Sequence, residues 1–383
     1  MSDKSPVKVG VLFSETGVTA PIETTQLCGT LFAIHEINAA GGIDGRELVP
    51  VRYDPRSEPS EYQALAERLI LQDKVNVIFG CYMSSTRKAV LPVVEKWNRL
   101  LFYPTLYEGF EFSNNVIYTG AAPNQNSVQL ADFMTSNFGS RAYLVGSDYI
   151  YPVESNRIMK DLVRQRGGTI LAECYLPLTA GVDDFLPVIR DIKKRDPSFI
   201  FSTVVGESTR HLYRAYAQAG LNPREVPIAS LTTCEVEVEG MGAEYAVGHF
   251  TAAPYFQSIA SETNHAVLKR YREFAGADVL TNMCWEAAYF QMHMFANAMR
   301  ECGTDELGAL VPGLVGVDYQ APQGRVRIDP VNHHTCLYPR IGRANSKGQF
   351  TIVREALRPV HPDPYLVSYS LGDWTTRLDT LDT

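Results

Sequence analysis

Short apolar runs alternate along this chain with longer segments in which apolar residues recur at helical spacing. In the first third of the chain, the pattern predicts five strands and three helices. The predicted strands are residues 7–13, 47–54, 75–79, 100–105 and 116–120. The predicted helices are residues 22–39, 60–72 and 89–97. Strands and helices that alternate at this spacing are typical of a parallel α/β sheet.

The same alternation restarts after residue 123. Its predicted helices are residues 127–138, 155–166, 184–195 and 208–219, and its predicted strands are 141–148, 169–175, 199–206 and 226–231. A long apolar helix at 282–300 follows, and then a tail with strands at 326–328, 337–343 and 350–354. Right-handed βαβ connections would build two parallel sheets from these elements. The predicted fold class is therefore α/β with two Rossmann-like lobes in tandem.

Two lobes joined by chain crossings face each other across a cleft. We predict crossings near residues 118–123, 252–256 and 322–325, where proline and glycine suit three short hinges. Ligand sites favour such clefts, and the turns that follow the strands of both units converge on this one. A ligand held by both lobes favours the closed form, so the pattern predicts a binding protein that closes on its ligand.

Composition narrows the function. The 383 residues are 45% hydrophobic and 20% charged, which is ordinary for globular domains. The formal net charge of −8, without a long Lys or Arg run, disfavours nucleic acid and anionic membrane as direct partners. Seven dispersed cysteines indicate neither a disulfide framework nor a metal site. No leader-like segment precedes the first strand, so we expect a cytoplasmic protein, or a periplasmic one if a leader was removed.

The turn Gly80–Lys88 is the most informative one. It follows the apolar strand 75–79 and precedes a predicted helix, and Ser84, Ser85 and Thr86 offer hydroxyls for the N-cap and first turn of that helix. The free backbone N–H groups of this turn can donate to a ligand oxygen. An ordinary capped helix start is the alternative interpretation.

These turns also carry long motifs that are similar to one family. The motifs are Leu12-Phe13-Ser14-Glu15-Thr16-Gly17, Gly80-Cys81-Tyr82-Met83-Ser84, Thr86-Arg87-Lys88-Ala89-Val90, Tyr103-Pro104-Thr105, Tyr107-Glu108-Gly109-Phe110-Glu111, Ala122-Pro123-Asn124-Gln125-Asn126 and Gly146-Ser147-Asp148-Tyr149-Ile150-Tyr151-Pro152. Together they resemble the aliphatic-amide sensors that act as negative regulators of amidase operons, the AmiC family. The resemblance covers nearly the whole chain, through Ala321-Pro322-Gln323-Gly324 to Pro362-Asp363-Pro364-Tyr365.

The resemblance implies a type I periplasmic-binding-protein fold, with an N-terminal lobe of residues 1–120 plus 256–323 and a C-terminal lobe of 121–255 plus 324–383. It implies a cytoplasmic sensor that sequesters an RNA-binding antiterminator (AmiR-like) until the inducing amide binds. Urea and short-chain amide receptors of ABC importers are related and share residues 107–109 and 119–125, so these motifs do not separate the two functions. Leu106 stands where the amide sensors are expected to have proline.

A neutral amide or urea needs hydroxyls and backbone groups around it but no charged clamp, because buried polar groups must be paired. Ser84 and Thr105 suit this role, and Thr232 and Thr233 extend it. Tyrosine rings can close round a methyl or NH2 group and keep their hydroxyls for hydrogen bonds. The predicted ligand-binding residues are Tyr82, Ser84, Tyr103, Thr105, Tyr149, Tyr151, Val205, Thr232 and Thr233. Of these, Ser84, Tyr103, Thr105, Tyr149 and Tyr151 are ligand-contact positions by resemblance.

Alternative chemistry is open at three places. Glu108 and Glu111 could be a paired acid and base, but we expect a structural role, with Glu108 accepting backbone N–H bonds in its loop. Cys81 could be a nucleophile, but no His lies near it in sequence and a buried thiol is the expected reading. His333-His334 could bind a metal, but adjacent strand residues point to opposite faces. We therefore predict a binding protein, not an enzyme, without cofactor or metal, and a homo-oligomer is an open possibility.

Overall fold

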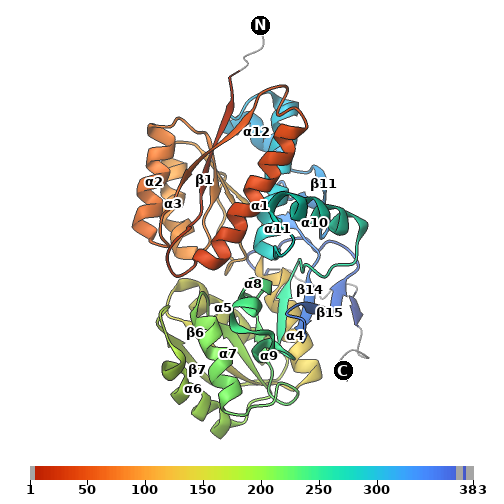
Figure 1. Cartoon of the computed structure of the whole chain (residues 1–383). Helices are drawn as coiled ribbons and strands as arrows, with labels where there is room; N and C mark the ends of the chain where they lie inside the picture. The colour runs from red at the N-terminus through yellow and green to blue at the C-terminus, as the bar shows by residue number, and fades with distance from the viewer. Residues whose placement is uncertain (1–4, 368–373, 377–383) are drawn as a thin grey trace.

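The computed structural model describes residues 5–367 and the backbone of 374–376, and it has two stacked lobes (Figure 1). The sheet of the upper lobe has the order β2-β1-β3-β4-β5, and its strands are all parallel. The elements are β1 (Val7–Leu12), α1 (Ala20–Ala39), β2 (Leu48–Tyr53), α2 (Pro59–Leu71), β3 (Val77–Gly80), α3 (Ser84–Lys96), β4 (Leu100–Tyr103) and β5 (Val116–Tyr118).

Later segments of the chain return to this upper lobe. Helix α11 packs along α1 (Figure 1). Its Trp285 stacks on Phe32 with 6.2 Å between ring centroids. Beside them lies a three-stranded sheet of order β11-β12-β13. These elements are α10 (Glu262–Ala275), α11 (Met283–Cys302), α12 (Leu307–Leu314), β11 (Asp318–Ala321), β12 (Gly324–Ile328) and β13 (Thr335–Cys336).

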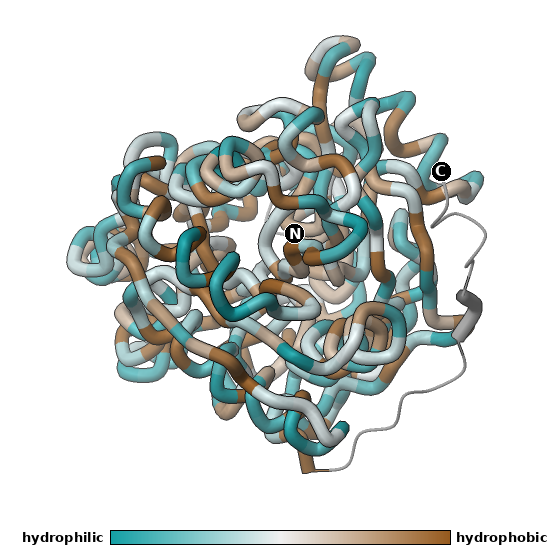
Figure 2. The backbone as a smooth tube through the Cα atoms, turned by 90° about the horizontal axis from the view of Figure 1, so that it is seen from below, coloured by the Kyte–Doolittle hydropathy of each residue, from teal (hydrophilic) through white to brown (hydrophobic). Residues whose placement is uncertain are grey.

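The lower lobe is built on an eight-stranded sheet of order β16-β15-β14-β10-β9-β8-β6-β7. Its elements are η1 (Pro123–Gln125), α4 (Ser127–Asn137), β6 (Arg141–Ser147), α5 (Ile150–Gln165), β7 (Thr169–Leu176), α6 (Val182–Arg195), β8 (Phe199–Thr203), α7 (Ser208–Gln218), β9 (Ile228–Ser230), α8 (Glu235–Met241), α9 (Ala243–Ala246), β10 (Phe250–Ala253), β14 (Arg340–Ala344), β15 (Phe350–Ala356) and β16 (Trp374–Thr376). Helical turns around the rim alternate between hydrophilic and hydrophobic residues (Figure 2).

The two-lobed α/β fold predicted from the sequence is confirmed, with one correction to the sheets. Only β6 to β10 of the lower sheet are parallel, because β14 pairs antiparallel with β10 and β15 with β14. The tail strands thus extend the lower sheet. Helices α8 and α10 were not predicted, and α5 begins at Ile150, five residues before the expected start. The exact boundaries of the two lobes stay a prediction. Residues 1–4 of the predicted N-terminal lobe and residues 368–373 and 377–383 of the predicted C-terminal lobe lie outside the described part of the chain.

Among the described residues, no helix has the length and apolar character that crossing a membrane requires.

The crossing at 322–325 is held by a buried carboxyl group. Glu286, on α11, is fully buried, and Gln323 donates to it from its backbone N (3.2 Å) and from Nε2 (2.8 Å). Arg340, from β14, donates to the Gln323 carbonyl at 2.9 Å. Burial raises the pKa of Glu286 to about 8, so its carboxyl is protonated in the folded protein at neutral pH.

We expect the pKa of Glu286 to make stability depend on pH. The folded pKa lies above the unfolded value of 4.5, so the stabilising contribution is full below pH 4.5 and is lost as pH rises toward 8. Glu286→Gln keeps the shape but does not titrate, so the fall in unfolding free energy over this window becomes shallower by about 1.4 kcal/mol per pH unit. Urea denaturation at several pH values measures the slope; equal slopes for both proteins would refute this assignment.

Candidate functional site

A small pocket lies where turns of the two lobes meet. Its upper wall comes from the turns after β3 and β4, and its lower wall from the N-terminus of α5 and the turns after β8 and β9. The lining residues are Tyr82, Ser84, Thr105, Leu106, Tyr149, Tyr151, Val205 and Thr232. All eight side chains are uncharged, and seven of them are among the nine residues predicted from the sequence.

The pocket is narrow in this arrangement of the lobes. Its volume is about 10 Å³. A cavity of this measure holds about one water molecule. Any organic ligand would therefore need the lobes further apart than they are in this arrangement.

Ser84, at the first position of α3, is held from behind by a buried ion pair. Its hydroxyl donates to Glu108 Oε2, and Arg87 Nη1 donates to Ser84 Oγ at 3.2 Å. Arg87 is fully buried and also pairs with Glu108 Oε1 at 3.2 Å. Because the Ser84 proton is engaged by Glu108, the hydroxyl oxygen can only accept a hydrogen bond from a ligand.

Glu111 completes the cluster behind the pocket. It pairs with Arg87 Nε at 2.7 Å and with Lys88 Nζ at 3.1 Å. Although burial alone would raise its pKa, the Arg87 and Lys88 charges win and lower the pKa of Glu111 to about 2. The Arg87 guanidinium also lies 4.8 Å and 4.6 Å from the ring centroids of Tyr103 and Tyr107. Two cations thus face two anions, which leaves the pocket wall without net charge.

The two threonines of the pocket present acceptors in the same way. Thr105 Oγ1 donates to the Cys81 carbonyl at 3.4 Å and accepts from Gln26 Nε2 at 2.9 Å. Thr232 Oγ1 donates to the Val204 carbonyl at 3.2 Å. With Ser84, three hydroxyls direct their protons into the protein and leave oxygen lone pairs for a ligand.

Hydrogen-bond donors for a ligand oxygen come from a tyrosine and from α3. Tyr151 is buried, and its hydroxyl has no partner in hydrogen-bonding geometry, although Ser155 lies one turn further along α5. Burial raises the pKa of Tyr151, so it remains a neutral donor. Helix α3 starts after Met83 without a side-chain cap, so the N–H groups of its first turn are open.

The structure places two predicted site residues behind the pocket wall. Tyr103, fully buried, donates its hydroxyl to the Tyr82 carbonyl at 2.7 Å. Thr233 Oγ1 donates to Ser230 Oγ at 3.0 Å and is 3.1 Å from the Tyr213 hydroxyl. Both residues brace the turns that carry lining residues, and a direct contact with the ligand stays a prediction for them.

Two sequence expectations about this region are wrong. Glu108 accepts from the Ser84 and Arg87 side chains, not from backbone N–H groups of its loop. The α3 hydroxyls do not cap the helix: Ser84 turns to Glu108, and Thr86 donates to the Met83 carbonyl at 2.8 Å. Sequence reasoning also missed Arg87 as the partner of both glutamates. The three-residue spacing of Ser84 and Arg87, which places them on one helix face, was the available signal.

The candidate nucleophile Cys81 and the candidate metal ligands His333 and His334 pack among other residues of the protein. Cys81 is fully buried with a left-handed backbone (φ 71°), and burial raises the pKa of its thiol. His334 stacks on Tyr118 at 4.1 Å between centroids, and His333 lies edge-on to Phe112. No cluster of three or more potential metal ligands occurs among residues 5–367.

Comparison with known proteins identifies the fold family. The family model of the periplasmic binding protein domain matches residues 7–371, nearly the whole chain. This chain belongs to the periplasmic binding protein family. Its members are binding proteins, which agrees with a ligand pocket between two lobes.

Individual relatives of this periplasmic binding protein are distant. The Leu/Ile/Val-binding protein homolog 6 of Brucella melitensis is 25% identical over 321 residues, which cover 79% of this chain and 82% of that protein. A leucine-, isoleucine-, valine-, threonine- and alanine-binding protein of Pseudomonas aeruginosa is 27% identical over 57% of this chain and 59% of its own length.

A solved structure confirms the fold over the full length. An ABC-transporter solute binding protein from R. palustris, in complex with 4-hydroxybenzoate, matches with a TM-score of 0.84 and 22% identity. The match covers 95% of this chain and 99% of that one. The type I periplasmic-binding-protein part of the sequence resemblance is thereby confirmed, and the amide-sensing part stays a proposal.

Proposed function

We propose that this periplasmic binding protein is a receptor for a small neutral amide or urea, which it encloses between its lobes. The observation that carries the proposal is the polarity of the pocket. Ser84, Thr105 and Thr232 offer acceptors to an NH2 group, while Tyr151 and the first turn of α3 offer donors to a carbonyl oxygen. An amide or urea carries both kinds of group on few atoms.

The uncharged lining argues against an amino acid or a benzoate as ligand. Those ligands belong to relatives named for branched-chain amino acids and to a structural neighbour with 4-hydroxybenzoate bound. In the part of the chain that the structure describes, no cationic side chain lines the pocket, because Arg87 behind it is fully buried and neutralised by Glu108 and Glu111. A carboxylate would find donors only in Tyr151 and the first turn of α3, and it would also face the three hydroxyl oxygens that can only accept. A charge without a partner is costly to bury.

Two roles are compatible with such a receptor. The relatives named above are binding proteins, and the solved structure comes from an ABC transporter, which supports a transport receptor and a periplasmic location. The second candidate is a regulator of amidase expression that releases an antiterminator protein, and its support is the set of motifs from Gly80 to Pro152. The two roles are separated by measuring the affinity of this protein for the product of the neighbouring gene, with and without amide. A complex that dissociates when amide is added supports the regulator, and a permease as the neighbouring gene product supports the transport receptor.

Ser84→Ala is expected to weaken binding of the amide without unfolding the protein. One lost hydrogen bond to a neutral group is worth about 0.5–1.5 kcal/mol, and the loss is larger where the buried N–H group of the ligand is left without a partner. Calorimetric titration of wild type and variant measures the change. Ser85→Ala, on the next residue, is the control that should bind normally; equal affinity in wild type and Ser84→Ala would remove Ser84 from the site.

The ligand class is tested by calorimetric titration with acetamide, propionamide, butyramide, urea and formamide, and with leucine and glutamate. We expect binding to one or more of the neutral compounds and none to the amino acids. Micromolar affinity for leucine or glutamate, with no binding of any amide or urea, would overturn the proposal.

A further inference from the structure

A second cavity lies in the lower lobe, away from the interlobe pocket. Its volume is about 250 Å³. It is lined by Asn137, Phe138, Pro223, Arg224, Gly248, Phe250 and Arg343. These residues come from the end of α4, the loop before β9, the segment that leads into β10 and the last residues of β14. No role in the interlobe pocket involves any of them.

The sheet separates the two cavities. Val205 and Thr232, which line the interlobe pocket, follow the carboxyl ends of β8 and β9. Arg224 precedes β9, and Phe250 is the first residue of the parallel strand β10. Both residues therefore lie at the amino ends of the strands, on the side of the sheet opposite to the interlobe pocket. A ligand in the second cavity would therefore not compete for the interlobe pocket.

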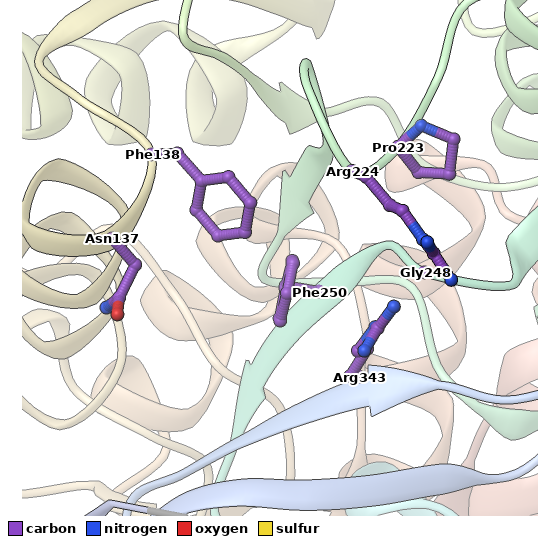
Figure 3. Close-up of a pocket in the computed structure, with 7 residues that line it drawn as sticks. All are labelled: Asn137, Phe138, Pro223, Arg224, Gly248, Phe250 and Arg343. Carbon is purple, nitrogen blue, oxygen red and sulfur yellow. The ribbon is translucent and has the colours of Figure 1, made fainter. Parts of the chain in front are cut away.

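Two arginines give the second cavity a positive character. Figure 3 shows the guanidinium groups of Arg224 and Arg343 pointing toward one another beside Phe250. Arg343 and Phe250 are paired across β14 and β10, which puts both side chains on one face of the sheet. The nearby carboxylate of Glu225 accepts from Asn222 Nδ2 at 3.3 Å. Two converging guanidinium groups suit a carboxylate, because a guanidinium group donates charge-assisted hydrogen bonds to it.

Part of the cavity wall is aromatic, and Asn137 is the polar side chain that lines it besides the two arginines. Phe138 and Phe250 meet edge to face with 5.3 Å between centroids, and Pro223 forms a further part of the wall (Figure 3). Aromatic rings in this arrangement favour contact with a flat apolar group. The combination of a cationic end and an aromatic wall fits a ligand that has an anionic end and an aromatic or apolar body.

We propose that this cavity is a second binding site, which takes a small organic anion with an aromatic or apolar body. The carboxylate lies between Arg224 and Arg343, and the body lies against Phe138 and Phe250. The site is independent of the amide proposed for the interlobe pocket, and the protein can carry both ligands at once.

The test is calorimetric titration of the full chain with benzoate, alone and with saturating acetamide or urea, and with acetate and inorganic phosphate for comparison. Arg343 has a further interaction in the molecule, so the test variant is Arg224→Gln. Arg164→Gln, an exposed position in the last turn of α5, makes the same change of charge elsewhere in the lobe.

We expect benzoate to bind more tightly than acetate, with no change when acetamide or urea is present. Arg224→Gln should weaken benzoate about tenfold, the loss of charge-assisted hydrogen bonds, and Arg164→Gln should not. The proposal is overturned if wild type does not bind benzoate, if Arg224→Gln binds it equally well, or if the amide displaces it. Tighter binding of phosphate than of benzoate would also overturn it, because the site would then recognise a bare inorganic anion.

Discussion

Arg87→Met is expected to destabilise the protein more than any other single change behind the pocket. Arg87 is fully buried and satisfies both Glu108 and Glu111. Without it, two carboxylates lose their main partner in a buried place, and breaking a buried ion pair in this way costs about 3–5 kcal/mol. Its stacking on Tyr103 and Tyr107 is lost as well. Urea denaturation at neutral pH measures the loss of unfolding free energy.

Lys88→Met is the matched control. Lys88 pairs with the same Glu111 at 3.1 Å, but its side chain is 41% exposed. Exposed ion pairs contribute about 0–1 kcal/mol, so this variant should stay close to wild type. If both variants lost the same small amount, the buried cluster would not be what holds the Ser84 turn.

The second large effect is expected at Gly120, just after β5. A Cβ at this position would lie 2.0 Å from the carbonyl carbon of Thr105 and 2.4 Å from the backbone N of Leu106. Backbone atoms cannot rotate away as the end of a side chain can, so Gly120→Ala must push the turn that carries two lining residues. Overpacking of this kind costs about 1–3 kcal/mol of stability. The displaced Thr105 should also reduce amide affinity by about tenfold or more.

Gly308→Ala provides the comparison for Gly120→Ala. Gly308 lies in α12, and apart from its chain neighbours and the backbone of its own helix no atom lies within 4 Å of a Cβ built there. Alanine is favoured over glycine in a helix by about 1 kcal/mol, so this variant should be as stable as wild type or more stable. Thermal unfolding measures the stability of both variants, and calorimetric titration measures their amide affinity. Normal amide binding by Gly120→Ala would show that the turn tolerates the shift.

Much of the fold follows from local patterns. The apolar run at 75–79 became the buried β3, and the turn after it carries Ser84 into the pocket, because ligands bind beyond the carboxyl ends of parallel strands. Strand alternation even explains the position of Tyr103. Tyr103 and Leu101 lie on one face of β4, and Leu100 and Phe102 pack into the hydrophobic core on the other face. The ring of Tyr103 therefore meets Arg87 instead of the ligand.

Other features depend on contacts between distant segments. Arg87 and Glu108 are 21 residues apart, and only the path of the loop after β4 brings them together. The antiparallel addition of β14 to β10 joins residues about 90 positions apart, which no local pattern encodes. The sequence does not distinguish the neighbours Thr232 and Thr233, yet Thr232 lines the pocket and Thr233 is turned toward Tyr213.

The central claim is that the interlobe pocket selects a neutral ligand by its N–H groups. The most direct measurement is a calorimetric comparison of acetamide with acetate, which have the same shape and number of heavy atoms but differ in the NH2 group and the charge. The account predicts that acetamide binds and that acetate neither binds nor displaces it at the interlobe pocket. Equal or tighter binding of acetate there would contradict the account.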